Sequence, residues 1–168
     1  MNPDRAVVAR QLGREPRGSW SVAARCSHGH PVTITVDPLL EDGSPFPTTW
    51  WLTCPHLVDE VGAIESRGGA AAWAARVSSD ADMGAAVLAA DAAYRGARAE
   101  RAGGTDPCPG VGIAGQADPC AVKCLHARVA AAIAGIPDPV GEGVVAGLDD
   151  RGRECAGDRC SVDVGIRG

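Results

Sequence analysis

The sequence has few lysines, few aromatic residues and no long hydrophobic run. Aromatic residues make up 4 % of the 168 positions, and Lys123 is the only lysine in the chain. No apolar run approaches the roughly 20 residues that a transmembrane helix needs, and Met1–Arg10 is too polar for a signal peptide. We therefore expect a cytoplasmic protein with a thin core, in a reducing compartment where cysteines remain free.

The charge balance and the missing motifs exclude several broad classes of function. A formal net charge of -5 argues against general binding to nucleic acids or membrane surfaces. The chain also lacks a Walker loop, a His-Glu-x-x-His zinc motif and a Gly-x-Ser-x-Gly nucleophile motif. With 45 % hydrophobic residues, the length suits a single domain with one core.

The apolar pattern predicts an α+β fold, with a small antiparallel sheet packed against about four to five helices. Val32, Ile34 and Val36 alternate with threonines, which is typical of a strand buried on one face. Residues 1–148 are expected to form a single domain, and the polar, glycine-rich residues 149–168 a disordered tail. A hairpin is predicted over 20–26 and 32–36, a third strand over 48–53, and helical segments over 2–12, 55–67, 70–77, 81–101, 118–134 and 141–148.

Cysteine and histidine occur together in three short motifs. They are C-S-H-G-H over residues 26–30, C-P-H over residues 54–56, and C-A-V-K-C-L-H over residues 120–126. The first lies in the predicted hairpin turn and the second where a strand gives way to a helix. Structural zinc sites often take ligands from such places, and a helix N-terminus also stabilises a thiolate.

The third motif allows two arrangements. If residues 118–134 form one regular helix, Cys120 and Cys124 share a face, whereas Cys124 and His126 point to nearly opposite sides. In that case Cys124 and His126 cannot hold one ion. If the chain is irregular there, Cys124 and His126 can act together. Lys123 and His126 are three residues apart and could flank an anionic or reacting group.

Our leading interpretation is a metal-binding protein. Cys26, Cys54 and Cys124 are the proposed ligands, with Cys120 or His126 as the fourth. Zinc is the first choice of metal and an iron–sulfur cluster the second, while a reactive thiol at Cys54 or Cys124 beside a histidine is a third possibility.

Two other classes of function stay open. In the first, Lys123 and His126 are catalytic residues of a small enzyme, and Arg14 and Arg17 bind a phosphate-like or other anionic substrate. In the second, the protein is a non-catalytic interaction module whose cysteines are core residues. Cys155 and Cys160 form a C-x4-C pair in the predicted tail, where they could bind a metal or oxidise.

Several motifs in fixed order resemble an uncharacterised actinobacterial family, domain of unknown function 501. The motifs are Q-L-G-R-E-P-R-G from residue 11, D-G-S-P-F-P-T from 42, W-L-T-C-P from 51, V-K-C-L-H-A from 122 and D-P-V-G from 138. The resemblance covers most of residues 8–148 and implies no assigned activity. Members are typically encoded beside a division-septum initiator and an exopolyphosphatase, which implies a protein partner in cell division or polyphosphate physiology by association only. A second histidine common in the family is replaced here at about Ala131.

Overall fold

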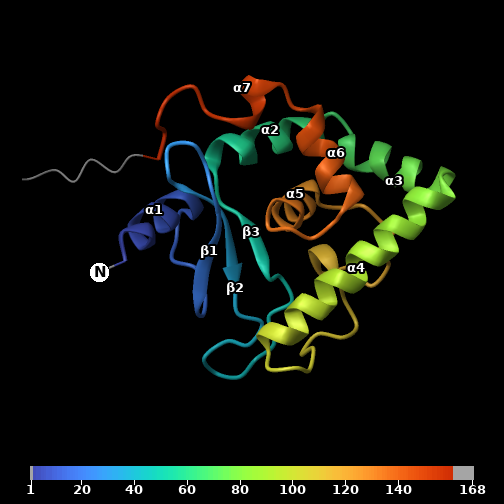
Figure 1. Cartoon of the computed structure of the whole chain (residues 1–168), viewed down its shortest axis with the longest axis horizontal. Coiled ribbons are helices and arrows are strands. Elements are labelled where there is room, and N and C mark those ends of the chain that lie inside the picture. The colour runs from blue at the N-terminus through green and yellow to red at the C-terminus, as the bar shows by residue number, and fades with distance from the viewer. Residues whose placement is uncertain (1, 161–168) are drawn as a thin grey trace, which may run out of the picture.

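A three-stranded antiparallel sheet lies beside a layer of helices in the computed structural model, which describes residues 2–160 (Figure 1). The strands β1 (Trp20–Arg25), β2 (Pro31–Val36) and β3 (Trp50–Leu52) follow one another in the order β1-β2-β3. The α+β prediction, including the hairpin and the third strand, is confirmed. The helices are α1 (Pro3–Leu12), α2 (Pro55–Ser66), α3 (Gly69–Ser79), α4 (Ala81–Arg101), α5 (Leu125–Ile133), α6 (Pro139–Gly147) and α7 (Asp150–Arg153), with a 3-10 turn, η1, over Ile113–Gly115.

The central strand β2 is buried on both faces, so the expectation of a half-buried strand is wrong. Ile34 packs with α1 on one face of the sheet. On the other face, Thr33 lies opposite Leu52 and Thr35 opposite Trp50, and these two partners belong to the main core. From Thr33 to Val36 the alternation therefore marks two different buried faces, because helices cover both sides of this small sheet, whereas Val32 joins the main core.

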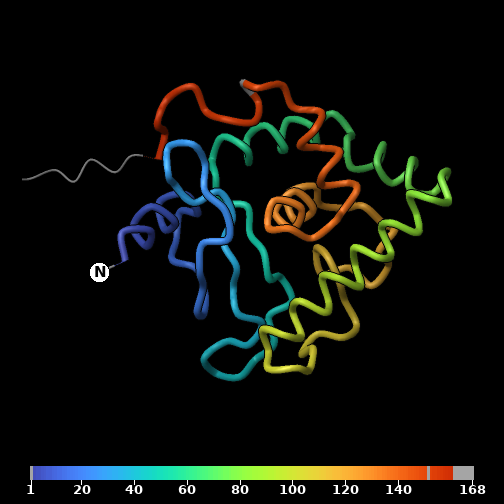
Figure 2. The backbone as a smooth tube through the Cα atoms, in the orientation of Figure 1, coloured from blue at the N-terminus to red at the C-terminus, as the bar shows by residue number. Residues whose placement is uncertain are grey.

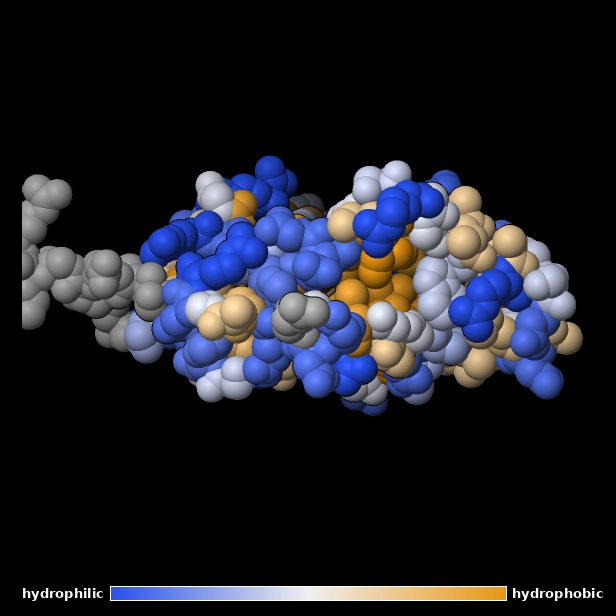
Figure 3. Space-filling model, turned by 90° about the horizontal axis from the view of Figure 1, so that it is seen from above, coloured by the Kyte–Doolittle hydropathy of each residue, from blue (hydrophilic) through white to orange (hydrophobic). Residues whose placement is uncertain are grey.

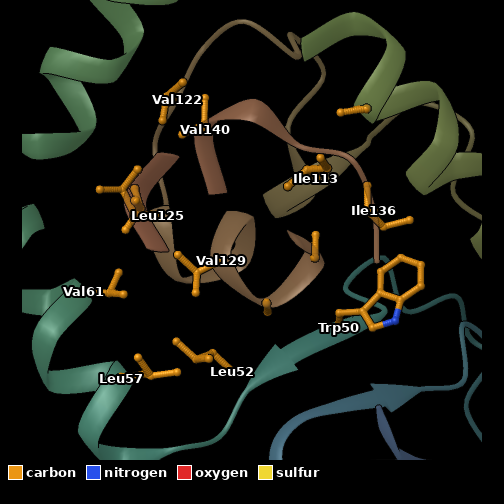
Figure 4. Packing of buried hydrophobic residues seen from close by; sticks show 14 of the residues in the cluster. Trp50, Leu52, Leu57, Val61, Ile113, Val122, Leu125, Val129, Ile136 and Val140 are labelled. Atoms are coloured by element: carbon orange, nitrogen blue, oxygen red, sulfur yellow. The ribbon is translucent and has the colours of Figure 1, made fainter. Parts of the chain in front are cut away.

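Helix α5 lies in the middle of the helical layer, close to α2, α6 and β3 (Figures 1 and 2). Leu125 and Val129 are fully buried, and Figure 4 shows them directed toward Val61 of α2 and Leu52 of β3. Burial of each such side chain contributes about 1.5–3 kcal/mol. The first turn of α5 is therefore held firmly in the core, and this fixes the residues beside it.

Helix α6 packs tightly on α5 around a buried ion pair. Asp138 caps α6 by accepting a hydrogen bond from the Val140 backbone N–H, and its carboxylate lies 3.2 Å from the guanidinium of Arg128. Both side chains are almost completely buried. A methyl group at Gly141 would collide with the Arg128 carbonyl. Because Pro139 occupies the first helical position, α6 begins two residues earlier than predicted.

Two long loops are held by one buried guanidinium. Arg98 of α4 forms an ion pair with Asp106 and donates hydrogen bonds to the carbonyls of Pro47 and Cys108.

The described residues contain no helix that combines the length and apolar character needed to span a membrane. The face in Figure 3 is largely polar, with a narrow apolar strip near its middle.

The C-terminal segment has structure where the sequence predicts a disordered tail. Residues 150–153 form α7, and the chain then runs back past the β1–β2 turn (Figure 1). Its polar side chains pair with ionisable groups, as in His30–Asp158 at 2.6 Å and Arg159–Asp59 at 3.0 Å. Polar composition alone does not reveal such partners. Residues 161–168 of the predicted tail lie outside the described residues.

Candidate functional site

Cys124 stands immediately before α5, in an extended conformation with φ -128° and ψ 109°. The helix predicted from residue 118 begins only at Leu125, because Asp118 and Pro119 form a turn in which the Asp118 carboxylate accepts a hydrogen bond from the Cys120 N–H. Cys124 and Cys120 therefore do not share a helical face. The chain is irregular at this point, as the second arrangement requires, and the Cys124 thiol lies in hydrogen-bond contact with His126.

The carboxylate of Glu65, in the last turn of α2, joins two consecutive residues of α5. One oxygen accepts a hydrogen bond from the Leu125 backbone N–H at 2.6 Å, and the other lies 3.1 Å from Nδ1 of His126. A negative charge is favourable at a helix N-terminus. The imidazole is also held from its far side, where Nε2 lies 3.0 Å from the carbonyl oxygen of Val58.

Both ring nitrogens of His126 face oxygen atoms that can only accept hydrogen bonds. A neutral imidazole has one N–H and one lone pair, so satisfying both contacts requires the doubly protonated cation. The hydrogen bond with Cys124, followed by that with the Val58 carbonyl and by the charge of Glu65, raises the pKa of His126 from 6.5 to about 9 against the opposing effect of burial. The ring is therefore charged at neutral pH.

The pKa of the Cys124 thiol shifts in the opposite direction, downward. Its hydrogen bond with His126 lowers the pKa of the thiol, and the backbone N–H of Ala127 adds to this, although burial and Glu65 act against it. A thiolate is also stabilised at the N-terminus of α5. The contact between Cys124 and His126 therefore favours the charged form of each group, lowering the pKa of the thiol and raising that of the imidazole.

The ligand atoms of Glu65, Cys124 and His126 all lie within 4.8 Å of one another. They form the only group of three or more cysteine, histidine or acidic residues at this spacing in residues 2–160. Cys124 and His126 open onto a pocket of about 240 Å³, smaller than the pockets that enclose drug-sized ligands. The other residues that line it are Thr48, Trp50, Trp51, Leu52, Ala114 and Ala127.

The proposed anion-binding residues do not share this pocket. Arg14 and Arg17 line a separate, narrow pocket on the α1 side of the sheet, where the Arg14 guanidinium lies 5.8 Å from the centre of the Trp51 ring. Lys123 is exposed and lines neither pocket. Trp51 borders both pockets, but the cationic groups and His126 are not gathered around one cavity.

The three cysteines predicted to share a metal are not brought together. Cys54 caps α2 as expected, and burial raises the pKa of its thiol. Cys26 lies at the end of β1, in a half-buried position. Neither belongs to the group around Cys124, and Cys120 is also outside it. The physical reason is that α5 holds Cys124 against the end of α2, whereas Cys54 lies at the start of that helix.

The cysteine and histidine motifs do not indicate Glu65, because it lies far from them in the sequence. A signal was present, since Glu65 continues the four-residue spacing of Leu57 and Val61 on the apolar face of α2. An acidic residue at the end of an apolar stripe faces the core, where it needs a partner.

Comparison with known families supports the resemblance seen in the motifs. The model of a family described as "Protein of unknown function (DUF501)" matches residues 22–146. The chain belongs to the DUF501 family. The matched DUF501 region contains Glu65, Cys124 and His126, whereas Arg14, Arg17 and the C-terminal segment lie outside it. No curated protein and no solved structure matches the chain.

Proposed function

We propose that this protein is a thiol-dependent enzyme in which Cys124 is the nucleophile. The observation that carries the proposal is the contact of both His126 nitrogens with oxygen acceptors beside the Cys124 sulfur. A protonated imidazole next to a cysteine is the arrangement that activates thiol nucleophiles, and a third group that orients the ring completes it. Glu65 is that third group.

The reaction class that suits this arrangement is acyl transfer. The sulfur of Cys124 attacks a carbonyl carbon of the substrate and forms a thioester, while the leaving group departs with the proton carried by His126. Water then attacks the thioester carbon and passes one proton to His126, the carbon–sulfur bond breaks to release the Cys124 thiolate, and the acid product keeps the hydroxyl of the water. The small pocket beside two tryptophans favours a small, largely apolar acyl group.

A burst experiment with a short-chain p-nitrophenyl ester tests this proposal. We expect about one equivalent of p-nitrophenolate per chain to be released rapidly, followed by slow turnover. Cys124→Ser should lose the burst, whereas Cys120→Ser, a matched change at a half-buried cysteine outside the site, should keep it. A burst of equal size in Cys124→Ser, or no burst in the wild-type protein, would refute nucleophilic catalysis by Cys124.

A second candidate function is metal binding at the same three residues. The spacing of the Glu65, Cys124 and His126 ligand atoms favours it, and a zinc ion held by three protein ligands would leave a position open for substrate. Zinc would displace a ring proton of His126, so the two candidates exclude one another. Stoichiometric zinc that disappears in both Cys124→Ser and Glu65→Gln would support the metal site and contradict the ion pair.

A further inference from the structure

A second gathering of cysteines lies where the C-terminal segment crosses the β1–β2 turn. Figure 1 shows this segment passing the turn near the start of α2. Ser27 donates a hydrogen bond to the Glu154 carboxylate at 2.5 Å. Together with the pairs His30–Asp158 and Arg159–Asp59, this contact fastens the segment to both the turn and the helix.

Cys160 is held inside this junction. Cys160 is only 7 % exposed, and so is Cys54. The amide of Gln11 lies 3.3 Å from the Cys160 sulfur and donates a hydrogen bond of 2.8 Å to the carbonyl of Pro31. The same carbonyl accepts a hydrogen bond from the hydroxyl of Thr53 at 3.4 Å. Gln11 therefore links Cys160 to the Pro31 carbonyl, which Thr53, the residue before Cys54, also contacts.

The remaining two cysteines border the same place. Cys26 opens the β1–β2 turn, where its N–H donates to the His30 carbonyl, and it packs against the core cluster that contains Cys54. The carbonyl of Cys155 lies 3.4 Å from Nε2 of His28 in that turn. Burial is the main reason that the pKa of the Cys54 thiol is raised, and the charges of Cys160 and Cys155 contribute further.

We propose that four cysteines bind one structural Zn²⁺ at this junction: Cys26, Cys54, Cys155 and Cys160. The ligands come from a hairpin turn, a helix start and a C-x4-C pair, which are the sources from which closed zinc sites are built. Each thiol releases its proton to solvent when it binds the ion. The ion would tie the C-terminal segment to the sheet and to α2.

Binding requires a local movement of the C-terminal segment. Among the described residues, no three of these sulfurs lie within 4.8 Å of one another. Residues 155–160 are held by side-chain contacts and contain neither strand nor helix, so they can shift toward Cys26 and Cys54 without unfolding an element. The C-x4-C pair lies beyond the matched DUF501 region, so this site would be a property of this chain and is independent of the chemistry proposed for Cys124.

Metal analysis of the full-length chain, purified under reducing conditions without metal-affinity chromatography, tests the inference. After incubation with zinc and removal of the excess, we expect one tightly bound zinc per chain. The double variant Cys155→Ser/Cys160→Ser should lose this zinc. Cys124→Ser should retain it, which separates this site from the one in the preceding proposal. The two tail positions are changed because substitution at the buried Cys54 could unfold the protein.

Cobalt substitution supplies a second readout. Co²⁺ bound by four thiolates gives strong thiolate charge-transfer bands and tetrahedral d–d bands, which should be present in the wild type and in Cys124→Ser but absent from the double variant. Wild-type protein without bound zinc, or zinc retained by the double variant, would overturn the proposal. Zinc lost only in Cys124→Ser would overturn it as well and would place the metal at Glu65, Cys124 and His126.

Discussion

Replacement of His126 by glutamine should remove most of the thiolate of Cys124 at neutral pH. Glutamine keeps a polar side chain of similar size but cannot carry the positive charge that lowers the thiol pKa. The change of the His126 pKa from 6.5 to about 9 corresponds to about 3 kcal/mol. Cys124 is the largest cause of this rise in the His126 pKa. Because coupling between two sites is reciprocal, His126 favours the thiolate of Cys124 in turn.

The expected effect can be estimated from this coupling. Because the ring is partly exposed, we assign about half of the 3 kcal/mol to the ion pair itself, which corresponds to about a tenfold loss of thiolate. The direction of the expected pH dependence follows from the lowered pKa of the Cys124 thiol. In the wild type the thiolate persists to lower pH than in an ordinary cysteine, and in His126→Gln it forms only at higher pH, since burial continues to raise the thiol pKa.

Alkylation with iodoacetamide, resolved by peptide mass spectrometry between about pH 5 and pH 9, measures this directly because only the thiolate reacts. Cys120, which is half-buried and outside the ion pair, serves as the internal reference in the same sample. The rate at Cys124 should fall about tenfold at pH 6 to 7 in the variant, while the rate at Cys120 stays unchanged. Identical pH profiles for Cys124 in the two proteins would refute the reasoning.

Three further outcomes are expected. In Cys124→Ser the pKa of His126, followed by NMR of the ring protons, should fall from about 9 toward 6.5, because the thiolate is the main cause of its rise; a value that stays near 9 would contradict the ion pair. Asp138→Ala should lower the free energy of unfolding by about 3–5 kcal/mol in urea titrations, since it leaves a buried arginine without its partner; a loss below about 1 kcal/mol would exclude that role. Gly141→Ala should destabilise the fold by at least about 1–3 kcal/mol because α6 touches the α5 backbone, whereas Gly96→Ala, in open space on α4, should stabilise it by up to about 1 kcal/mol; equal effects would show that the close approach is not real.

Much of the fold follows from local rules that act within a few residues. Pro55 predicts the start of α2, because proline is favoured at the first helical position. The chain from 81 to 101 forms one helix as predicted, with Asp80 as its cap. The start of α5 was predicted wrongly because Asp118 and Pro119 satisfy the same local rule but form a turn. Val122 is buried in the core, so the chain enters the core before the helix begins.

The sequence predicts only two of the three residues of the candidate site, Cys124 and His126, for a related reason. Cys124 and His126 are neighbours in the chain, so their association could be considered as one of two alternatives. Glu65 lies about 60 residues away and meets them only because α2 and α5 pack side by side. The Val58 carbonyl and Glu65 add to the effect of Cys124 in raising the pKa of His126, and no local pattern encodes contacts between two separate helices.

The position of Lys123 has a practical consequence for chemistry on this chain. A lysine-specific protease has one target bond in the whole sequence, and it lies in an exposed position of a loop, directly before Cys124. Cleavage there would free the α-amino group of Cys124, and an N-terminal cysteine reacts with peptide thioesters to restore an amide bond. The segment before Cys124 could thus be made synthetically and joined to the remainder without introducing any foreign residue.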